Sequence, residues 1–373
     1  MLHIHQVNLQ PAAGGGEVYT RHLARVLAEA GAQVTNYVSA ANRFWDDLSG
    51  EHIACVGVED EAGFLAHLPR ERSIILTQGP LSQRTLGILA AAHRLTGFAH
   101  MPMYQRSADE FRPFRLVFSV SRYCIELLRG AGLERVYPEP VYGIADLARG
   151  DAPILARSPY DMDRRKFRDR LLGALERLTA GLRSRAPFTR RSGIALGIVS
   201  LLSPIKQLPQ LFAILAPLIA RHQSVNIEVF GMGGYAQVRD LRRALTPLGA
   251  RARFWGYQPN VAAIYPQLDY LMTGLPEKEA LGLNAIEAQS CGTPVLSPDA
   301  PPFTETVLHG ASGFRYRDPR EDGGHDFAGL LRSIVSGRPR PDPRIQAREH
   351  LAQFSHAALV ARARRMIAVL SEL

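Results

Sequence analysis

Short apolar segments alternate with amphipathic segments over most of the 373 residues, and this alternation limits the fold more than any other feature of the sequence. Near the N-terminus, an apolar segment (2–9) and a glycine-rich turn precede an amphipathic segment (17–31) and a second apolar segment (32–39). Apolar residues spaced three or four apart predict a helix at 17–31, and Gly31 suits its end. The order strand, helix, strand predicts a parallel sheet covered by helices.

The same order returns in the second half of the chain, with strands predicted at 193–202, 225–231 and 252–257 and helices at 207–221 and 235–249. A chain of this length exceeds one typical hydrophobic core, so two domains are expected. The predicted fold class is α/β, with two Rossmann-like domains whose parallel sheets face a central cleft.

We divide the chain into four parts, namely an N-terminal Rossmann-like domain (1–150), a basic helical connector (151–191), a C-terminal Rossmann-like domain (192–345) and a C-terminal helix (346–373). The C-terminal helix has an apolar side, and the N-terminal domain is one partner against which it could pack.

Composition and targeting signals point to a reducing compartment. The three cysteines lie far apart without a ligand spacing, so neither a disulfide framework nor a zinc site is indicated. The N-terminal segment lacks a basic leader and an apolar core, and no run of 18 apolar residues occurs. We therefore expect a cytoplasmic protein without membrane spans.

The net charge of +9 is concentrated in one segment. Residues 161–191 carry ten basic and four acidic side chains, which leaves +3 for the rest of the chain. Leucines at helical spacing between the arginines would let this segment lie on an anionic membrane, and a solvated connector helix is an equal alternative. Nucleic acid is not an expected partner, because the segment has little aromatic interleaving and no recognisable binding motif.

Gly14, Gly15 and Gly16 lie between a predicted strand and a predicted helix, where glycine lets backbone amides approach a phosphate or sugar. A nicotinamide site would require GxGxxG, but position 19 is tyrosine, and no acidic residue follows the second strand to hold a ribose. A dehydrogenase is therefore disfavoured, and a plain tight turn is the alternative.

Two glutamates, Glu279 and Glu287, stand in an otherwise apolar stretch. Residues 276–282 are predicted as a loop and a helix should begin at residue 283 or 284, with Gly292 after its end. Amides at that helix start would point at an anion, and a carboxylate among apolar neighbours needs a donor such as a ribose diol. The alternative is a solvated helix face.

The spacing Glu279-x7-Glu287, with Gly282 between them and "EAQSCGTPVL" at 287–296, resembles the E-x7-E motif of retaining GT-B glycosyltransferases of family 4. The resemblance extends over most of the chain. It includes the glycine turn, "SVSRYCIELLRGAGL" (119–133), "SPIKQ" (203–207), "FGMGG" (230–234) and "RFWGYQPNVAAIYPQLDYL" (253–271).

The resemblance implies that residues 192–345 bind a nucleotide-sugar and that residues 1–150 form the acceptor-side domain. It implies three catalytic residues, His100, Lys206 and Glu279. It implies donor-binding roles for Gly15, Gly16, Gly256, Tyr257, Ala280, Leu281, Gly282, Leu283 and Glu287. In this pattern Glu287 holds the ribose, Glu279 and the amides after it hold the sugar and phosphates, and Lys206 holds the diphosphate. The backbone near Gly256 meets the base, His100 lies beside the reacting sugar, and the glycine turn approaches the diphosphate or the acceptor.

The implied activity is transfer of a sugar, with retention, from a nucleotide-sugar to an acceptor hydroxyl, with no cofactor and no metal. The "DMD" at 161–163 lies in the basic connector, where helix capping is the better interpretation. A UDP-sugar is favoured over a GDP-sugar. The implied acceptor is a saccharide or a lipid-linked molecule in bacterial polysaccharide, lipopolysaccharide or glycolipid synthesis, which allows a peripheral location on the inner face of the cell membrane.

One position departs from the family pattern. Where the family has an arginine ahead of the phosphate-binding lysine, "SLLSPIK" has Leu201, while Lys206 is kept. Loss of a charge-assisted phosphate contact would cost about 1.5–3 kcal/mol. Two alternatives therefore stay open: a UDP-sugar epimerase of the same fold, which would need further acid and base carboxylates, and a non-catalytic nucleotide- or sugar-binding protein.

Overall fold

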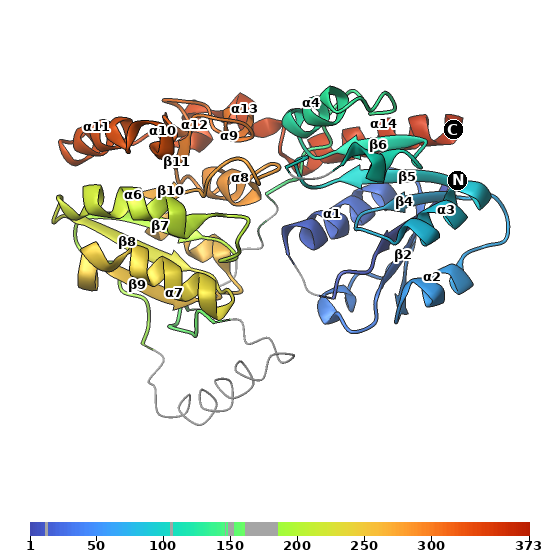
Figure 1. Ribbon diagram of the computed structural model, residues 1–373, viewed down its shortest axis with the longest axis horizontal. Coiled ribbons are helices and arrows are strands. Elements are labelled where there is room, and N and C mark those ends of the chain that lie inside the picture. Colours follow the sequence, from blue (N-terminus) through green and yellow to red (C-terminus); the bar gives the residue numbers. More distant parts are fainter. Residues whose placement is uncertain (12–13, 105–106, 146, 148–152, 161–185) are drawn as a thin grey trace. The chain divides into compact units, whose positions relative to one another are not determined.

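The computed structural model describes residues 1–373 except 12–13, 105–106, 146, 148–152 and 161–185. The chain forms two compact units. The first consists of Met1–Ile144 and Ala352–Leu373, and the second of Ala145–Leu351. Each unit is built on a sheet of six parallel strands with helices on both faces, so the predicted α/β class with two Rossmann-like sheets is confirmed (Figure 1).

The sheet of the first unit has the strand order β3-β2-β1-β4-β5-β6. Its strands are β1 (His3–Asn8), β2 (Gln33–Ser39), β3 (Ile53–Val58), β4 (Ile74–Thr77), β5 (Arg94–Ala99) and β6 (Leu116–Ser119). Its helices are α1 (Gly15–Glu29), α2 (Glu61–His67), α3 (Gln83–Ala92), α4 (Arg122–Gly130) and α14 (His356–Glu372), with short 3₁₀ turns η1 (Arg43–Trp45) and η2 (Ala108–Phe111).

Alternation along the strands of the first unit separates its two faces. Val7 of β1 and Ile75 of β4 join the core under α2, α3 and α4, so Gln6 and Asn8 point to the opposite face. That opposite face is covered by α1, against which the C-terminal helix α14 packs. Helix α1 begins at Gly15, so two of the three predicted turn glycines form its first turn instead of a loop.

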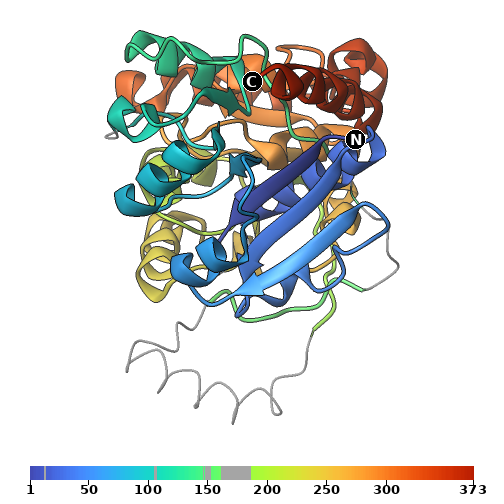
Figure 2. The same cartoon turned by 90° about the vertical axis from the view of Figure 1, so that its right-hand side faces the viewer.

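The strand order of the first unit reverses direction between β1 and β4, which are hydrogen-bonded neighbours. Figure 2 shows the first strands of this sheet, β1 to β3, as blue arrows that run side by side. In open parallel sheets, ligands bind at the carboxyl ends of the strands where the order reverses. The segments that follow β1, β4 and β5 therefore position any ligand site of this unit.

The second unit repeats this topology with the strand order β12-β11-β10-β7-β8-β9. Its strands are β7 (Ile194–Val199), β8 (Val225–Phe230), β9 (Ala252–Gly256), β10 (Tyr270–Met272), β11 (Val295–Pro298) and β12 (Gly313–Tyr316). Its helices are α6 (Leu208–Ala220), α7 (Tyr235–Ala244), α8 (Leu283–Ser290), α9 (Phe303–Thr306), α10 (Pro319–Asp322), α11 (His325–Val335), α12 (Pro343–Gln346) and α13 (Arg348–Ala352), with 3₁₀ turns η3 (Thr246–Arg251), η4 (Val261–Ala263) and η5 (Tyr265–Gln267).

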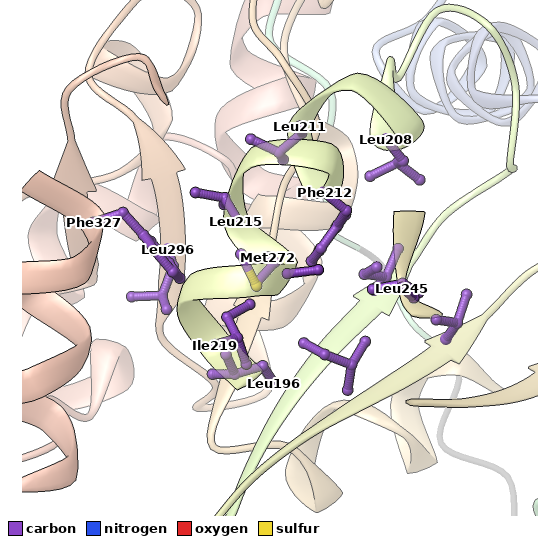
Figure 3. Close-up of a cluster of buried hydrophobic side chains, with 14 of the residues drawn as sticks. Leu196, Leu208, Leu211, Phe212, Leu215, Ile219, Leu245, Met272, Leu296 and Phe327 are labelled. Carbon is purple, nitrogen blue, oxygen red and sulfur yellow. The ribbon is translucent and has the colours of Figure 1, made fainter. Parts of the chain in front are cut away.

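Helix α6 supplies much of the core of the second unit. Leu211, Phe212 and Leu215 are fully buried against strand residues that include Leu196 and Leu296 (Figure 3). Full burial of one such side chain stabilises the fold by roughly 1.5–3 kcal/mol. The first residue of α6 follows Lys206 and Gln207, so this packing also fixes the end of the loop that carries the predicted phosphate ligand.

Two sequence predictions of secondary structure need correction. The helix predicted at 235–249 ends at Ala244 and continues as the 3₁₀ turn η3, since Pro247 has no amide hydrogen to extend the α-helical pattern. Strand β5 was not predicted because Arg94, Thr96 and Gly97 interrupt its apolar run. The strand forms despite these residues because β4 and β6 pair with it along both edges.

The predictions about membrane spans and about the basic connector concern different parts of the chain. Within the part of the chain that the structure describes, no helix is long and apolar enough to cross a bilayer. Most of the predicted basic connector, including the "DMD" at 161–163, lies outside the described residues, and the predicted membrane contact of 161–191 stays a prediction.

Candidate functional site

The loops that follow β7 and β10 form the centre of the candidate site. These two strands are hydrogen-bonded neighbours at the point where the strand order of the second unit reverses. The backbone amide of Leu275 donates to the carbonyl of Lys206 at 3.2 Å, which joins the two loops directly. A Cβ at Gly274 would lie 2.1 Å from that carbonyl oxygen, so only glycine permits this approach.

Lys206 and Glu279, both predicted as catalytic, form an ion pair across these loops. The ammonium Nζ of Lys206 donates to Oε2 of Glu279, and the other carboxylate oxygen accepts the backbone amide of Gly282 at 3.1 Å. Their side chains are 20% and 14% exposed, so both are shielded yet reachable from solvent. The pair carries no net charge, and an incoming phosphate would meet one cation and one anion together.

Helix α8 begins where the sequence predicts. Its N-terminal residue is Leu283, and Gly282 caps it with φ of 77°, a left-handed conformation that favours glycine. The amide of Ala285 donates to the carbonyl of Gly282 at 2.9 Å, so the amides of Leu283 and Asn284 precede the first intrahelical hydrogen bond and lie at the positive end of the helix dipole. Asn284 anchors this turn by donating its Nδ2 to the carbonyl of Val199, at the end of β7, at 3.1 Å. The start of α8 is thereby held beside the loop after β7.

Glu287 lies one turn further along α8 and is partly buried. The hydroxyl of Tyr265 donates to its Oε2 at 2.7 Å. Burial raises the pKa of the Glu287 carboxyl to about 7, while the hydrogen bond from Tyr265 and the charge of Lys206 oppose the rise. The sequence predicted that this carboxylate needs a donor. It missed Tyr265, because the two residues are 22 positions apart and no spacing rule connects them.

A second set of polar contacts holds the loop after β10, and no sequence pattern predicted these contacts. Glu277 accepts two hydrogen bonds from Arg320, each at 2.7 Å, and one from the side chain of Gln207 at 3.0 Å. The guanidinium of Arg320 holds the pKa of Glu277 below its usual range. Because Arg320 is engaged by Glu277 and Asp318, it does not stand in for the arginine that position 201 lacks.

Three further positions lie at the carboxyl ends of strands in the second unit. The carbonyl of Gly256 accepts the amide of Gly231 at 2.8 Å, and the following Tyr257 is 51% exposed. Leu201, after β7, is 48% exposed. An apolar side chain in solvent at the family's arginine position leaves Lys206 as the cation of the loop after β7.

The predicted residues Ala280 and Leu281 are buried in the loop before α8, and the predicted residues Gly15, Gly16 and His100 belong to the first unit. The capping position of α1 is Gly14, whose amide donates to the carboxylate of Glu17 at 2.8 Å. The helix start near the glycines is therefore already close to a carboxylate, which favours a hydroxyl-bearing ligand over a phosphate there.

His100 follows β5 and is partly buried against α1. Its ring stacks on Phe98 at 5.0 Å and meets the edge of Tyr19 at 5.0 Å. Nε2 lies 2.6 Å from the side-chain oxygen of Gln78. Burial lowers the pKa of His100 to about 3, so the ring is neutral at physiological pH.

No group of three or more histidine, cysteine, aspartate or glutamate side chains with metal-binding geometry occurs among the residues that the structure describes. The predicted independence of metal stays a prediction. The roles that the family resemblance implies for individual residues likewise stay predictions at this point.

Comparison with known proteins finds a family model that matches part of the second unit. Residues 192–349 match the family model described as "Glycosyl transferases group 1". Over 173 residues the chain is 29% identical to a D-inositol 3-phosphate glycosyltransferase of Rhodococcus erythropolis, and the match covers 43% of this chain and 38% of that protein. The chain thus matches well under half the length of this curated relative.

Solved structures resemble the whole chain. A structure of Anabaena Alr3699/HepE in complex with UDP and glucose superposes with a TM-score of 0.69 at 19% identity, over 100% of both chains. Sucrose-phosphate synthase from Thermosynechococcus elongatus superposes with a TM-score of 0.72 at 16% identity, again over 100% of both chains. At these identities the likeness establishes the fold.

Proposed function

We propose that this chain, which has the GT-B fold and whose residues 192–349 belong to the glycosyl transferases group 1 family, transfers a sugar from a nucleotide-sugar donor to an acceptor hydroxyl. The observation that carries the proposal is the grouping of Lys206, Glu279 and Glu287 around the start of α8. A cation, a set of helix-start amides and a buried carboxylate are the groups that a diphosphate joined to a ribose requires.

Glu287 is the proposed ribose ligand. An ionised carboxylate accepts hydrogen bonds from both hydroxyls of a diol, and these would replace the hydration that burial removes. Tyr265 already donates one hydrogen bond to Oε2 at 2.7 Å, which orients the group and leaves acceptor capacity for the ribose. Because the pKa of Glu287 is raised to about 7, the fraction in the binding-competent form is sensitive to pH near neutrality.

Lys206 and the first amides of α8 are the proposed diphosphate ligands. As the sugar departs, negative charge develops on the distal phosphate, and fixed dipoles with a nearby cation stabilise it without reorganisation. Glu279 holds Lys206 in place before the donor binds and accepts the Gly282 amide, so it also sets the shape of the loop. On donor binding, the ammonium would be shared between Glu279 and phosphate.

The proposed reaction retains the configuration of the transferred sugar. The bond between the anomeric carbon and the phosphate oxygen breaks, the acceptor oxygen bonds to the same face, and the leaving phosphate takes the hydroxyl proton. This route uses neither a carboxylate nucleophile nor a metal. A UDP-sugar is the favoured donor, and UDP is bound in the Anabaena structure of the same fold.

The acceptor is proposed to be a saccharide or a lipid-linked molecule of bacterial polysaccharide, lipopolysaccharide or glycolipid synthesis. Support for a lipid-linked acceptor is the excess of basic over acidic residues at 161–191, which suits an anionic membrane surface on the cytoplasmic side.

Thermal unfolding with nucleotides tests the proposal. A ligand present at 100 times its Kd stabilises the folded state by about 2.7 kcal/mol, which is readily measured. UDP or GDP, and one of their sugars, should raise the Tm of the wild type, and Glu287→Gln should weaken that shift. Glu321→Gln, an exposed carboxylate on α10, is the matched control. A folded wild-type sample whose Tm is raised by no nucleotide or nucleotide-sugar would contradict the proposal.

Turnover separates the proposed transferase from its alternatives. Isomerisation of UDP-N-acetylglucosamine without an acceptor would identify an epimerase. Binding of a donor with no turnover against any acceptor would identify the non-catalytic protein that Leu201, in place of the usual arginine, suggests. Release of UDP or GDP that depends on both an acceptor and Lys206 would support the transferase.

A further inference from the structure

A chain of buried amide side chains crosses the first unit between its sheet and α1. Gln6 on β1, Asn36 on β2 and Gln78 after β4 are each at most 5% exposed. Their side chains are hydrogen-bonded in series and end at His100, which follows β5. Burial of a neutral amide in a core is costly unless its polar atoms have partners. Both polar atoms of Gln6 and of Gln78 have one, whereas Nδ2 of Asn36 has none among the residues that the structure describes.

The direction of every hydrogen bond in the series follows from one backbone carbonyl. The side chain of Gln6 approaches the carbonyl oxygen of Thr20 at 3.2 Å. A carbonyl can only accept, so the Gln6 atom that faces it is Nε2, and the same nitrogen donates to Oδ1 of Asn36 at 2.6 Å. The oxygen of Gln6 therefore faces the other way, toward Gln78.

The next two steps are then forced. The Gln78 atom that lies 3.0 Å from Oε1 of Gln6 must be the nitrogen, because two oxygens without a proton would repel. Oε1 of Gln78 then faces His100 at 2.6 Å and can only accept, so Nε2 of the imidazole must carry the proton. The tautomer of His100 is thus set by a carbonyl three hydrogen bonds away.

We propose that Gln78 is a positioning residue that holds His100 as the Nε2–H tautomer, so that Nδ1 offers a lone pair to a hydroxyl of the ligand. No described residue donates a hydrogen bond to Nδ1, and the ring is partly exposed. The second ring nitrogen thus accepts a hydrogen bond from a hydroxyl and repels a carboxylate or phosphate oxygen.

Two further observations agree with this assignment. Burial keeps the ring neutral, as its lowered pKa of about 3 indicates, so a tautomer is well defined over the physiological range. The rings of Phe98 and Tyr19 hold the imidazole plane on two sides. The statement about the ligand rests on the proposed function, whereas the statement about the tautomer does not.

Nitrogen NMR of protein labelled in its imidazole rings tests the tautomer in the absence of any substrate. Comparison with His100→Gln assigns the His100 signals. We expect a protonated Nε2 and an unprotonated Nδ1 from pH 5 to 8. In Gln78→Met, of similar volume but without an acceptor, the Nδ1–H form should become populated. Gln83→Met on exposed α3 is the control and should leave the spectrum unchanged.

A wild-type spectrum with the proton on Nδ1 would overturn the proposal, and this result needs no variant to fold. An unchanged Nε2–H population in a folded Gln78→Met protein would overturn it equally. Both outcomes leave the proposed transferase activity intact.

Once a donor and acceptor are known, Gln78→Met should lower kcat/KM roughly tenfold, the size of one hydrogen bond, while Gln83→Met should not change it. An unchanged kcat/KM in Gln78→Met would overturn the ligand part of the inference and leave the tautomer part standing. Failure of every donor in the wild type would count against the proposed function alone.

Discussion

In the unit that ends at Leu351, the charged side chains of Lys206, Glu279 and Glu287 lie in the segments that follow the central strands, whereas in the N-terminal unit Gln78 and the neutral imidazole of His100 follow β4 and β5. Both sheets have the same strand order, so the topology offers each unit the same place for a ligand. The chemistry at that place differs. Charged groups suit an anion such as a diphosphate, and a fixed neutral network suits the hydroxyls of a sugar.

The largest expected effect comes from removing the positive charge of Lys206. Lys206→Met should reduce kcat/KM by about 100-fold, since a charge-assisted phosphate contact contributes about 1.5–3 kcal/mol and position 201 offers no second cation. Steady-state assays with a saturating acceptor measure the effect. Arg239→Met, on the exposed face of α7, controls for loss of positive charge and should be neutral. A loss below threefold in Lys206→Met would mean that another group binds the phosphates.

The next test concerns the ribose carboxylate. Glu287→Gln should weaken binding of UDP-glucose about tenfold at pH 8, because a neutral amide accepts more weakly than a carboxylate. Wild-type affinity should rise between pH 6 and 8 as Glu287, whose pKa is about 7, loses its proton. The variant should lack this rise. Calorimetry with UDP-glucose is suitable, because its diphosphate has no ionisation near neutrality. Parallel pH profiles would exclude Glu287 as the titrating group.

The same titration affects stability with a defined sign. The folded pKa of about 7 exceeds the ordinary value of 4.5, so the folded state keeps a proton that the unfolded state releases. Between pH 4.5 and 7, the unfolding free energy therefore falls as pH rises, by up to roughly 3 kcal/mol from this group. Urea unfolding without ligand should show this contribution in the wild type and not in Glu287→Gln.

Much of the second unit was predictable, and for physical reasons. Helix α8 was located because a glycine with positive φ at each end is a local requirement that the sequence displays directly. Strands buried on both faces appear as apolar runs. Contacts such as Tyr265 with Glu287, or Arg320 with Glu277, join positions whose separation carries no pattern, so only the fold brings them together. The amide series of the first unit was missed for the same reason, although glutamine and asparagine within apolar strands were visible.

Replacing one buried glutamine in each unit compares how much their hydrogen bonds contribute to stability. Gln6→Met leaves Oδ1 of Asn36 and Nε2 of Gln78 without the partner shown in the structure, so we expect a loss of about 3 kcal/mol. Gln289 is also fully buried, and its Nε2 donates to the backbone carbonyls of Ala285 and Thr306. The carbonyl of Thr306 also accepts a hydrogen bond from His350, so it keeps a partner when Gln289 is replaced. Gln289→Met should therefore cost about 1 kcal/mol less. Equal losses in chemical denaturation would mean that the amide series of the first unit is no more cooperative than isolated hydrogen bonds.

The smallest expected effect comes from one hydroxyl in the charged site. The hydrogen bond from Tyr265 lowers the pKa of Glu287 against the effect of burial, so Tyr265→Phe should raise that pKa further. The midpoint of the pH profile for UDP-glucose binding should move upward by about one unit or less, since a hydrogen bond to a charged group contributes about 1.5–3 kcal/mol and water replaces part of it. Tyr257→Phe, on the exposed ring after β9, changes the same atom elsewhere and should leave the midpoint in place. A midpoint that moves downward in Tyr265→Phe would mean that the hydroxyl accepts a hydrogen bond from protonated Glu287 and so stabilises the neutral form of that carboxyl.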